Sequence, residues 1–314
     1  MRGGVGDMVT SRNWLRDFAF DAGAVRVRKT GALVPLESGI VREVATWFPY
    51  FFAVRAASAP RRFTIAFAPD RARPWYLIWP VVKLAGGVIV DDPREADVVF
   101  HFDDSTESPN APPSGVRADA WLLNFNCATV SKSAVARAFE QAFGYPLALD
   151  PRTHHGPAVE KSELNGAHDG RIVQCPIEPR PDRVYQRVID NRARNGLVED
   201  LRTPTIAGRP ICVFRKRRPL EERFANHNAE VELAATQDVF SAAEMDNIAA
   251  FARILGLDWG GMDVLRDGED GRLYIVDVNK TDMGPPIALP LRNKMAATRA
   301  LSAALIEYLE SPRH

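Results

Sequence analysis

The sequence predicts an α/β protein that is divided into several lobes. Between residues 63 and 125, short apolar runs typical of strands alternate with helical or loop segments, which favours a layer of parallel strands with helices. Residues 256–286 follow a different pattern, because two short alternating runs flank a turn at Asp267-Gly268, as in a β-hairpin. The chain has 314 residues and 46% hydrophobic composition, which is enough for two or three lobes with cores of their own.

The charge balance limits the classes of partner. Forty basic residues cancel 40 acidic ones, so no overall field attracts nucleic acid or an anionic membrane, and a small-molecule or protein substrate is favoured. Cys127, Cys175 and Cys212 are widely spaced and form no C-x-x-C pair, which argues against a disulfide framework or a structural zinc site. The sequence shows no signal-peptide pattern and no apolar run long enough to span a bilayer, so we expect a cytoplasmic protein without a membrane segment.

The chain is predicted to fall into four parts. Residues 1–60 are expected to form an N-terminal extension with a helix around residues 37–57, to which we assign no function. Its aromatic cluster at residues 47–52 favours a core contact, or a subunit contact in a homo-oligomer, and the alternative is a contact with a membrane or a ligand. The other three parts are an N-terminal α/β lobe at 61–128, a central lobe at 129–185 and a C-terminal lobe at 186–314.

In the central lobe, Ser131 is the expected N-cap of a helix that ends before Gly144, and Lys132 falls in its first turn. Two strand-like runs then flank a polar loop that contains Gly166 and Gly170. Glycines allow backbone N–H groups to close over phosphate oxygens, and Lys161 at the entrance of the loop adds a mobile positive charge. A plain hairpin turn is the alternative interpretation.

An apolar strand at residues 184–190 connects the central lobe to the C-terminal lobe. Such a segment could present backbone groups to a purine edge and Asp190 to ribose hydroxyls, or it could be a simple linker. A second hairpin around Gly208 leads into the basic run 215–218, which is either a solvated edge or a set of ligands for anionic oxygens. A capping box at Ser241 and Glu244 starts a helix that we expect to pack behind the hairpin at 256–286.

That hairpin gathers acidic and amide oxygens. Asp277 and Asn279 lie two apart, so on a strand they project from the same face. Asp263 joins them on that face if the hairpin loop has an odd length, whereas an even loop sends it to the other face. Three hard oxygen ligands suit Mg²⁺ or Mn²⁺ better than zinc. The alternative is that both acids are merely solvated.

Taken in order, these motifs resemble the ATP-grasp superfamily over about residues 125–290. The resemblance is to the branch of glutathione synthetase-like and ribosomal-protein glutamate ligases, in which a GLD-x-x-G-x-D stretch precedes an acid-x-Asn pair, here residues 256–263 with Asp277 and Asn279. The chain departs from the pattern in two places. The acid is aspartate where the family more often has glutamate, and no Pro-Gly step follows the asparagine.

The resemblance implies an ATP-grasp fold, with a Rossmann-like N-terminal lobe and two lobes that hold ATP between antiparallel sheets. It implies Mg²⁺ at Asp263, Asp277 and Asn279, with Mn²⁺ as a substitute. It also implies that the nucleotide contacts lie at Lys132, Lys161, Asn165, Gly166, His168, Gly170, Gln186, Arg187, Val188 and Asp190.

The implied reaction is the ATP-dependent joining of a carboxylate and an amine. The carboxylate attacks the γ-phosphate to give an acylphosphate and ADP, and the amine then displaces phosphate. Arg202, Arg215 and Asn226 are the candidates for stabilising the transferring group. The substrates could be small molecules, peptides or proteins. Two alternatives remain, which are a kinase that phosphorylates an alcohol at the same ATP site and a nucleotide-binding regulatory protein without turnover.

Overall fold

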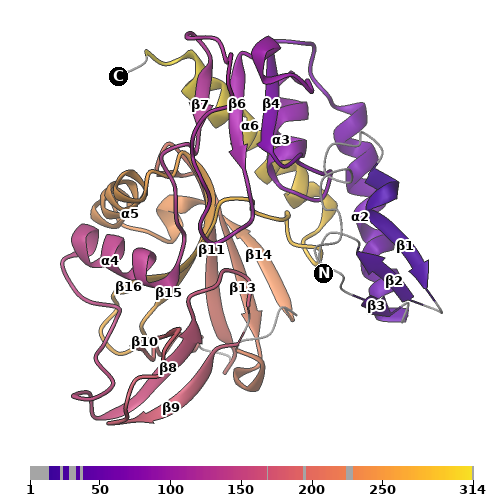
Figure 1. Ribbon diagram of the computed structural model, residues 1–314. Helices are drawn as coiled ribbons and strands as arrows, with labels where there is room; N and C mark the ends of the chain where they lie inside the picture. The colour runs from indigo at the N-terminus through magenta and orange to yellow at the C-terminus, as the bar shows by residue number, and fades with distance from the viewer. Residues whose placement is uncertain are drawn as a thin grey trace. The chain divides into compact units, whose positions relative to one another are not determined.

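The structure is a computed structural model that describes residues 14–21, 24–27, 33–35, 38–167, 169–193, 196–223 and 229–312. The chain divides into two compact units (Figure 1). Unit 1 comprises residues 1–102, 113–122 and 283–302, and unit 2 comprises residues 103–112, 123–282 and 303–314. The predicted α/β class is confirmed, whereas the finer division into four parts stays a prediction.

Unit 1 is built around a four-stranded sheet with the order β5-β4-β6-β7. Its strands are β4 (Phe63–Pro69), β5 (Gly87–Ile89), β6 (Val98–Phe102) and β7 (Trp121–Leu123). β4 runs parallel to both β5 and β6, as the sequence predicts. The η2 turn (Pro93–Glu95) precedes β6.

Three helices accompany this sheet, namely α2 (Ser38–Ala56), α3 (Ile78–Leu84) and the larger part of α6 (Leu291–Glu310). Tyr50 and Val54 of α2 are buried against Met295 of α6, and the Tyr50 hydroxyl lies 2.7 Å from Thr298 Oγ1. The predicted helix at 37–57 is thus confirmed. Its aromatic cluster is partly a core element, because Tyr50 is buried while Phe52 remains 62% exposed.

A second, small sheet in unit 1 was not foreseen. It is antiparallel and consists of β1 (Phe18–Asp21), β2 (Ala24–Val27) and β3 (Leu33–Pro35), after the short η1 turn (Trp14–Asp17). Strands of three or four residues are too short for a clear alternation of apolar and polar positions.

Unit 2 contains two antiparallel sheets. The smaller has the order β10-β8-β9, with β8 (Gly156–Ser162), β9 (Arg171–Cys175) and β10 (Arg183–Arg187). The larger has the order β14-β13-β11-β15-β16, and β12 (Arg209–Pro210) pairs with β11. Its other strands are β11 (Val198–Ile206), β13 (Val213–Arg218), β14 (Glu230–Ala234), β15 (Trp259–Arg266) and β16 (Leu273–Asn279). The turns η3 (Leu220–Glu222) and η4 (Thr236–Asp238) flank β14.

Helices α4 (Lys132–Phe143) and α5 (Ala242–Leu255) lie side by side in unit 2 (Figure 1). Their apolar faces share one core with the larger sheet, including Phe139, Phe251, Met262 and Val278. Burial of each such side chain contributes about 1.5–3 kcal/mol, so this core fixes which face of the sheet is covered. The predicted N-cap at Ser131 and the capping box at Ser241 are both confirmed.

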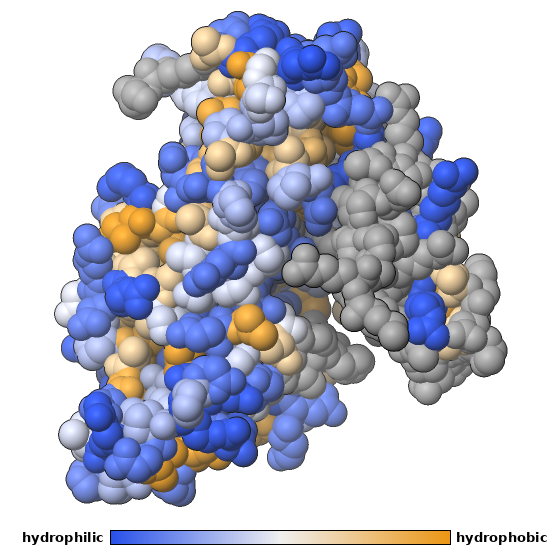
Figure 2. Space-filling model, in the orientation of Figure 1, coloured by the Kyte–Doolittle hydropathy of each residue, from blue (hydrophilic) through white to orange (hydrophobic). Residues whose placement is uncertain are grey.

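The surface of unit 2 is mixed in character. Figure 2 shows mainly hydrophilic residues over the smaller sheet at the lower end of the view, with limited hydrophobic areas between them. Among the described residues, no helix combines the length and the apolar character needed to cross a membrane.

Candidate functional site

The side chains of Asp263 and Asp277 lie opposite each other on neighbouring strands. In the ladder between β15 and β16, Asp263 pairs with Asp277, whereas the next pair is Val264 with Ile275. The register therefore shifts at this point, and Val276 is the extra residue of a β-bulge. The bulge has a geometric consequence. The hairpin loop, residues 267–272, has an even length, which alone would leave Asp277 on the covered face with Ile275, and the extra residue brings Asp277 to the open face of Asp263.

The same alternation sorts the whole sheet into an apolar and a charged face. Met262, Val264 and Val278 are fully buried in the core on one face. The other face borders a cavity of about 200 Å³, which is also lined by β8, by the loop that follows it and by the segment after β10. The charged residues around this cavity are Lys132, Lys161, Asp169, Arg187, Asp200, Lys216, Arg218, Arg223, Asp263 and Asp277.

Two ion pairs hold the opposed carboxylates in the ligand-free chain. Lys132 Nζ lies 2.5 Å from Asp277 Oδ1, and Arg202 Nη1 lies 3.0 Å from Asp263 Oδ2. Lys132, Asp263 and Asp277 line the cavity, whereas Arg202 is not among the lining residues, and the cavity volume is below the roughly 300–1,000 Å³ of common ligand sites. If a nucleotide binds here, its phosphates would compete with Asp277 and Asp263 for contacts with Lys132 and Arg202.

Arg202 is held from both sides. Its guanidinium bridges Asp263 and Asp282, and it forms a further 3.2 Å hydrogen bond from Nε to Asp282 Oδ1. Gly261 leaves the room for this arrangement, because a Cβ atom there would lie 2.2 Å from Asp282 Oδ2 and 2.7 Å from Arg202 Nε. Burial alone raises the pKa of Asp263, but the charges of Arg202 and Lys216 outweigh it and hold this pKa well below its ordinary value. Asp263 is thus ionised.

The donor set fits a hard divalent cation such as Mg²⁺. Asp263 Oδ1 is buried without a hydrogen-bond partner, and it faces the half-exposed carboxylate of Asp277 across the strand pair. In the part of the chain that the structure describes, no group of three or more His, Cys, Asp or Glu side chains could hold a metal alone. A cation here would need further oxygens, and Mg²⁺ is commonly held by one or two carboxylates together with substrate phosphates. The third predicted ligand, Asn279, accepts hydrogen bonds at Oδ1 from Thr281 N at 2.9 Å and Thr281 Oγ1 at 3.2 Å.

Lys161 reaches across to the larger sheet. Its Nζ donates a 3.0 Å hydrogen bond to the carbonyl oxygen of Val276, the bulge residue. Burial lowers the pKa of Lys161 to about 8, and the neighbouring Lys132 adds to this effect while Asp277 opposes it. Burial therefore disfavours the charged form of Lys161, and an anion bound beside it would stabilise that form.

The loop between β8 and β9 is fastened at several points. The Glu163 carboxylate accepts hydrogen bonds from Ser133 N, at 3.0 Å, and from Ser133 Oγ in the first turn of α4. Asn165 N donates to Thr106 Oγ1 at 2.8 Å, and Ser162 N donates to Asp169 Oδ1 at 3.1 Å. Two of the predicted phosphate-loop residues, Gly166 and Gly170, line the cavity. Asn165 is not among the lining residues, and His168 lies outside the described residues.

The strand predicted to meet the base lines the cavity in part. Gln186 is buried and its Nε2 has no hydrogen-bond partner, so the amide can donate to a ligand. Arg187 also borders the cavity, but Val188 does not. The carboxylate of Asp190 is held by Arg192, with Nε at 2.7 Å, and this hydrogen bond lowers the pKa of Asp190.

The basic run at 215–218 is divided between the two faces of its strand. Arg215 pairs with the core residue Leu201, so the structure does not bring it to the cavity. Lys216 and Arg218 border the cavity instead, although the sequence singled out Arg215 of this run, and sequence reasoning missed Asp200. Alternate residues of a strand share a face, so pairing Arg202 with Phe214 would have placed Lys216 and Arg218 on the face of Arg202. The remaining candidate, Asn226, lies outside the described residues.

Comparison with known proteins yields structural matches alone. No family model matches this sequence, and no curated protein matches it either. The ATP-grasp ligase PsnB, solved with a minimal precursor, Mg and ADP, shares 15% identity over 79% of this chain and 97% of its own, with a TM-score of 0.49. A RimK domain ATP-grasp protein from Sphaerobacter thermophilus shares 14% identity over 79% of this chain and 100% of its own, with a TM-score of 0.47. The D-cycloserine synthetase DcsG shares 13% identity over the same fractions, 79% and 100%, with a TM-score of 0.46.

Proposed function

We propose that this chain is an ATP-grasp enzyme, an ATP- and Mg²⁺-dependent ligase that joins a carboxylate to an amine through an acylphosphate. The observation that carries the proposal is the facing pair Asp263 and Asp277, which lines one cavity together with Lys132 and Lys161, while Arg202 pairs with Asp263. Paired carboxylates beside several cations suit a metal–triphosphate complex better than an uncharged ligand.

In this proposal the nucleotide phosphates lie between the two sheets of unit 2. Lys132 and Lys161 contact phosphate oxygens, and Gln186 donates its unpaired amide hydrogen to the base. Asp263 and Asp277, with help from Asn279, would hold Mg²⁺, which would supply charge neutralisation at the transferring phosphoryl group. Arg202 and Lys216 stand on the same face and stabilise negative charge as it moves to the acceptor.

The acceptor of the phosphoryl group is a substrate carboxylate. Its oxygen attacks the γ-phosphorus, the bond to the β,γ-bridging oxygen breaks, and ADP leaves. An amine then attacks the acyl carbon, phosphate leaves and a proton is released. This chemistry requires positioning and charge neutralisation, and no nucleophilic side chain of the protein takes part. The loop after β8 would keep water from the acylphosphate.

The three cysteines are free and buried, which supports a reducing compartment such as the cytoplasm. The identity of the two substrates is open to small molecules, peptides and protein termini.

The test uses hydroxylamine as a general amine. Purified protein is incubated with Mg·ATP, hydroxylamine and pooled carboxylates, and the readouts are ADP and the coloured complex of iron(III) with the hydroxamate. A ligase releases ADP, phosphate and hydroxamate in equal amounts for one pool. A stable phosphorylated product without free phosphate would instead identify a kinase, and nucleotide binding without ADP release from any pool or alcohol would identify a regulatory protein.

A further inference from the structure

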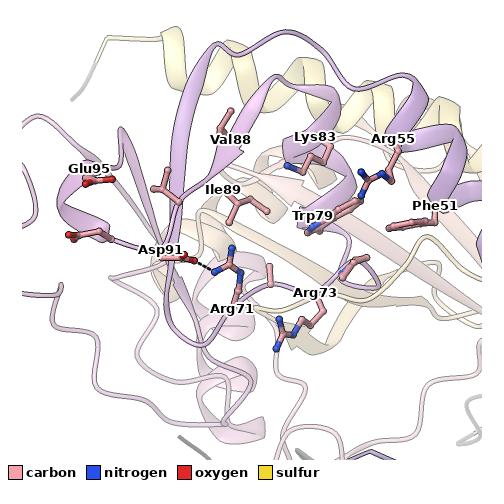
Figure 3. A pocket seen from close by; sticks show the side chains of 14 residues that line it. Phe51, Arg55, Arg71, Arg73, Trp79, Lys83, Val88, Ile89, Asp91 and Glu95 are labelled. Carbon is pink, nitrogen blue, oxygen red and sulfur yellow. Dashed lines mark hydrogen bonds and ion pairs between the residues drawn. The ribbon is translucent and has the colours of Figure 1, made fainter. Parts of the chain in front are cut away.

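Unit 1 contains a cavity of its own, which has no part in the nucleotide site. Its volume is about 660 Å³, within the roughly 300–1,000 Å³ range of small-molecule sites. Residues of α2, α3 and β5 line it, together with the segments that follow β4 and β5 (Figure 3). Phe51 of the aromatic cluster at residues 47–52 is among the residues that line it.

One wall of the cavity is aromatic and aliphatic. The rings of Phe51 and Trp79 are stacked, with centroids 5.6 Å apart and an interplanar angle of 20°. Pro74, Val88 and Ile89 extend the apolar lining. Such a surface suits a flat or branched apolar group.

Two cations stand over these rings. The guanidinium of Arg55 lies 5.7 Å from the centroid of Phe51, and Lys83 Nζ lies 5.8 Å from that of Trp79. Within the described ranges, neither Arg55 nor Lys83 has a carboxylate within ion-pair distance. Burial lowers the pKa of Lys83, and repulsion from Arg55 and Arg71 lowers it further. An anion between Arg55 and Lys83 would relieve this repulsion.

The other charges around the cavity are neutralised locally. Arg71 pairs with Asp91, and Arg73 Nε lies 2.6 Å from Asp17. Asp92 pairs with Arg94 at 2.6 Å. The last acid, Glu95, lies on the far side of the lining from Phe51 and Arg55 in Figure 3. The positive charge that lacks a counter-charge is therefore concentrated at the aromatic end.

We propose that this cavity binds a small organic anion, a carboxylate or phosphate monoester with an aromatic or apolar body. The anionic group lies between Arg55 and Lys83, and the body packs against Phe51 and Trp79. The site belongs to unit 1 alone and does not depend on the function proposed for unit 2.

The test is a titration without nucleotide, followed by the indole N–H resonances in ¹H–¹⁵N NMR spectra. Trp79→Phe identifies the Trp79 resonance. The probes are N-acetylphenylalanine, its neutral amide, phenyl phosphate and inorganic phosphate. We expect saturable shifts of the Trp79 resonance with the carboxylate, the phosphate monoester or both, and none with the amide or inorganic phosphate. The two aromatic anions distinguish which anionic group is preferred.

Variants locate the site. Lys83→Met and Arg55→Gln each remove one charged hydrogen-bond donor and should weaken binding by about tenfold or more. The matched control is Arg61→Gln, an exposed arginine of the same unit outside the lining, which should bind like the wild type. Thermal melting of each variant checks that it is folded. Equal binding of acid and amide, wild-type affinity in both charge variants, or no saturable shift with either aromatic anion would overturn the proposal. Because nucleotide is absent, these outcomes are independent of the ATP site.

Discussion

Lys161 Nζ donates a hydrogen bond of 3.0 Å to the carbonyl oxygen of Val276, the extra residue in the bulge of β16. A bulge residue is left out of the strand ladder, so its carbonyl group is free to accept from another element. The same bulge places Asp263 opposite Asp277. One irregularity in the ladder thus fixes both the acidic pair and the position of a lysine from the smaller sheet.

The first prediction concerns the acidic pair. Asp277→Asn should lower Mg²⁺-dependent ADP formation by about 10²–10³-fold, because it removes one charged ligand of the metal–phosphate complex. The fold should persist, since Asp277 is half-exposed and its carboxylate contributes no core packing. Steady-state ADP release and thermal melting measure the two effects.

Asp270→Asn is the control for that variant. Asp270 is an exposed acid in the turn of the same hairpin, where it accepts a 2.9 Å hydrogen bond from Arg272 N. Its replacement should leave ADP formation unchanged. Near-normal activity of Asp277→Asn, or equal losses in both variants, would remove the metal assignment.

The second prediction is a pH dependence of nucleotide binding. Burial lowers the pKa of Lys161 to about 8, so the charged form predominates below that pH and is lost above it. A bound phosphate favours the charged form. The affinity for a nonhydrolysable ATP analogue should therefore fall as the pH rises through this value, which isothermal titration at constant ionic strength measures.

Lys161→Met tests the origin of that dependence. The variant should bind the analogue more weakly at neutral pH, and its affinity should no longer change around pH 8. A wild-type affinity that stays constant from one unit below this pKa to one unit above it would contradict the assignment of Lys161.

The third prediction concerns the two ion pairs that hold Arg202 beside Gly261. Gly261→Ala would place a Cβ atom 2.2 Å from Asp282 Oδ2, so the pair of Asp282 with Arg202 must move. Overpacking of this kind costs about 1–3 kcal/mol of unfolding free energy, measurable by denaturant titration. ADP formation should also fall, because Arg202 loses its fixed position.

Gly268→Ala is the matched control on the same hairpin. Among the described residues other than its chain neighbours, Asp190 O is the sole atom within 4 Å of a Cβ there, at 3.2 Å. We expect a smaller loss of stability and no loss of ADP formation. If Gly261→Ala lowers the free energy of unfolding no more than Gly268→Ala does, Gly261 is not needed to make room for Arg202 and Asp282.

The fourth prediction concerns the loop after β8. Glu163 caps the first turn of α4 through Ser133, so Glu163→Ala should cost about 0.5–2 kcal/mol, as the loss of other helix caps does. Amide hydrogen exchange in residues 163–167 should become faster. Glu178→Ala, an exposed glutamate beyond β9, should change neither quantity. Unchanged exchange in Glu163→Ala would show that this contact does not hold the loop.

Local signals predicted much of the fold. Ser131 and Ser241 begin helices because their side chains accept hydrogen bonds from backbone N–H groups, an effect confined to a few neighbouring residues. The apolar runs at 63–69 and 98–102 likewise became the paired strands β4 and β6. Such features depend little on the rest of the chain.

The parts that sequence reasoning missed depend on distant pairing. Whether Arg215 or Lys216 faces the cavity is decided by the register of β13 against β11, which no local pattern fixes. Whether Asp263 and Asp277 share a face depended on whether the hairpin loop has an odd or an even number of residues. The even loop alone would place them on opposite faces, and the bulge at Val276 brings them to the same face. The cavity over Phe51 and Trp79 joins residues from separate helices, so it carries no motif.

The most direct test of the central claim is thermal melting with a nonhydrolysable ATP analogue and Mg²⁺. At 100 times its dissociation constant, a ligand stabilises the folded state by about 2.7 kcal/mol, which raises the melting temperature by a few degrees. We predict that the rise requires both the adenine nucleotide and Mg²⁺, and that Lys161→Met or Asp277→Asn abolishes most of it. An unchanged melting temperature at saturating nucleotide and Mg²⁺ would contradict the proposed ATP site.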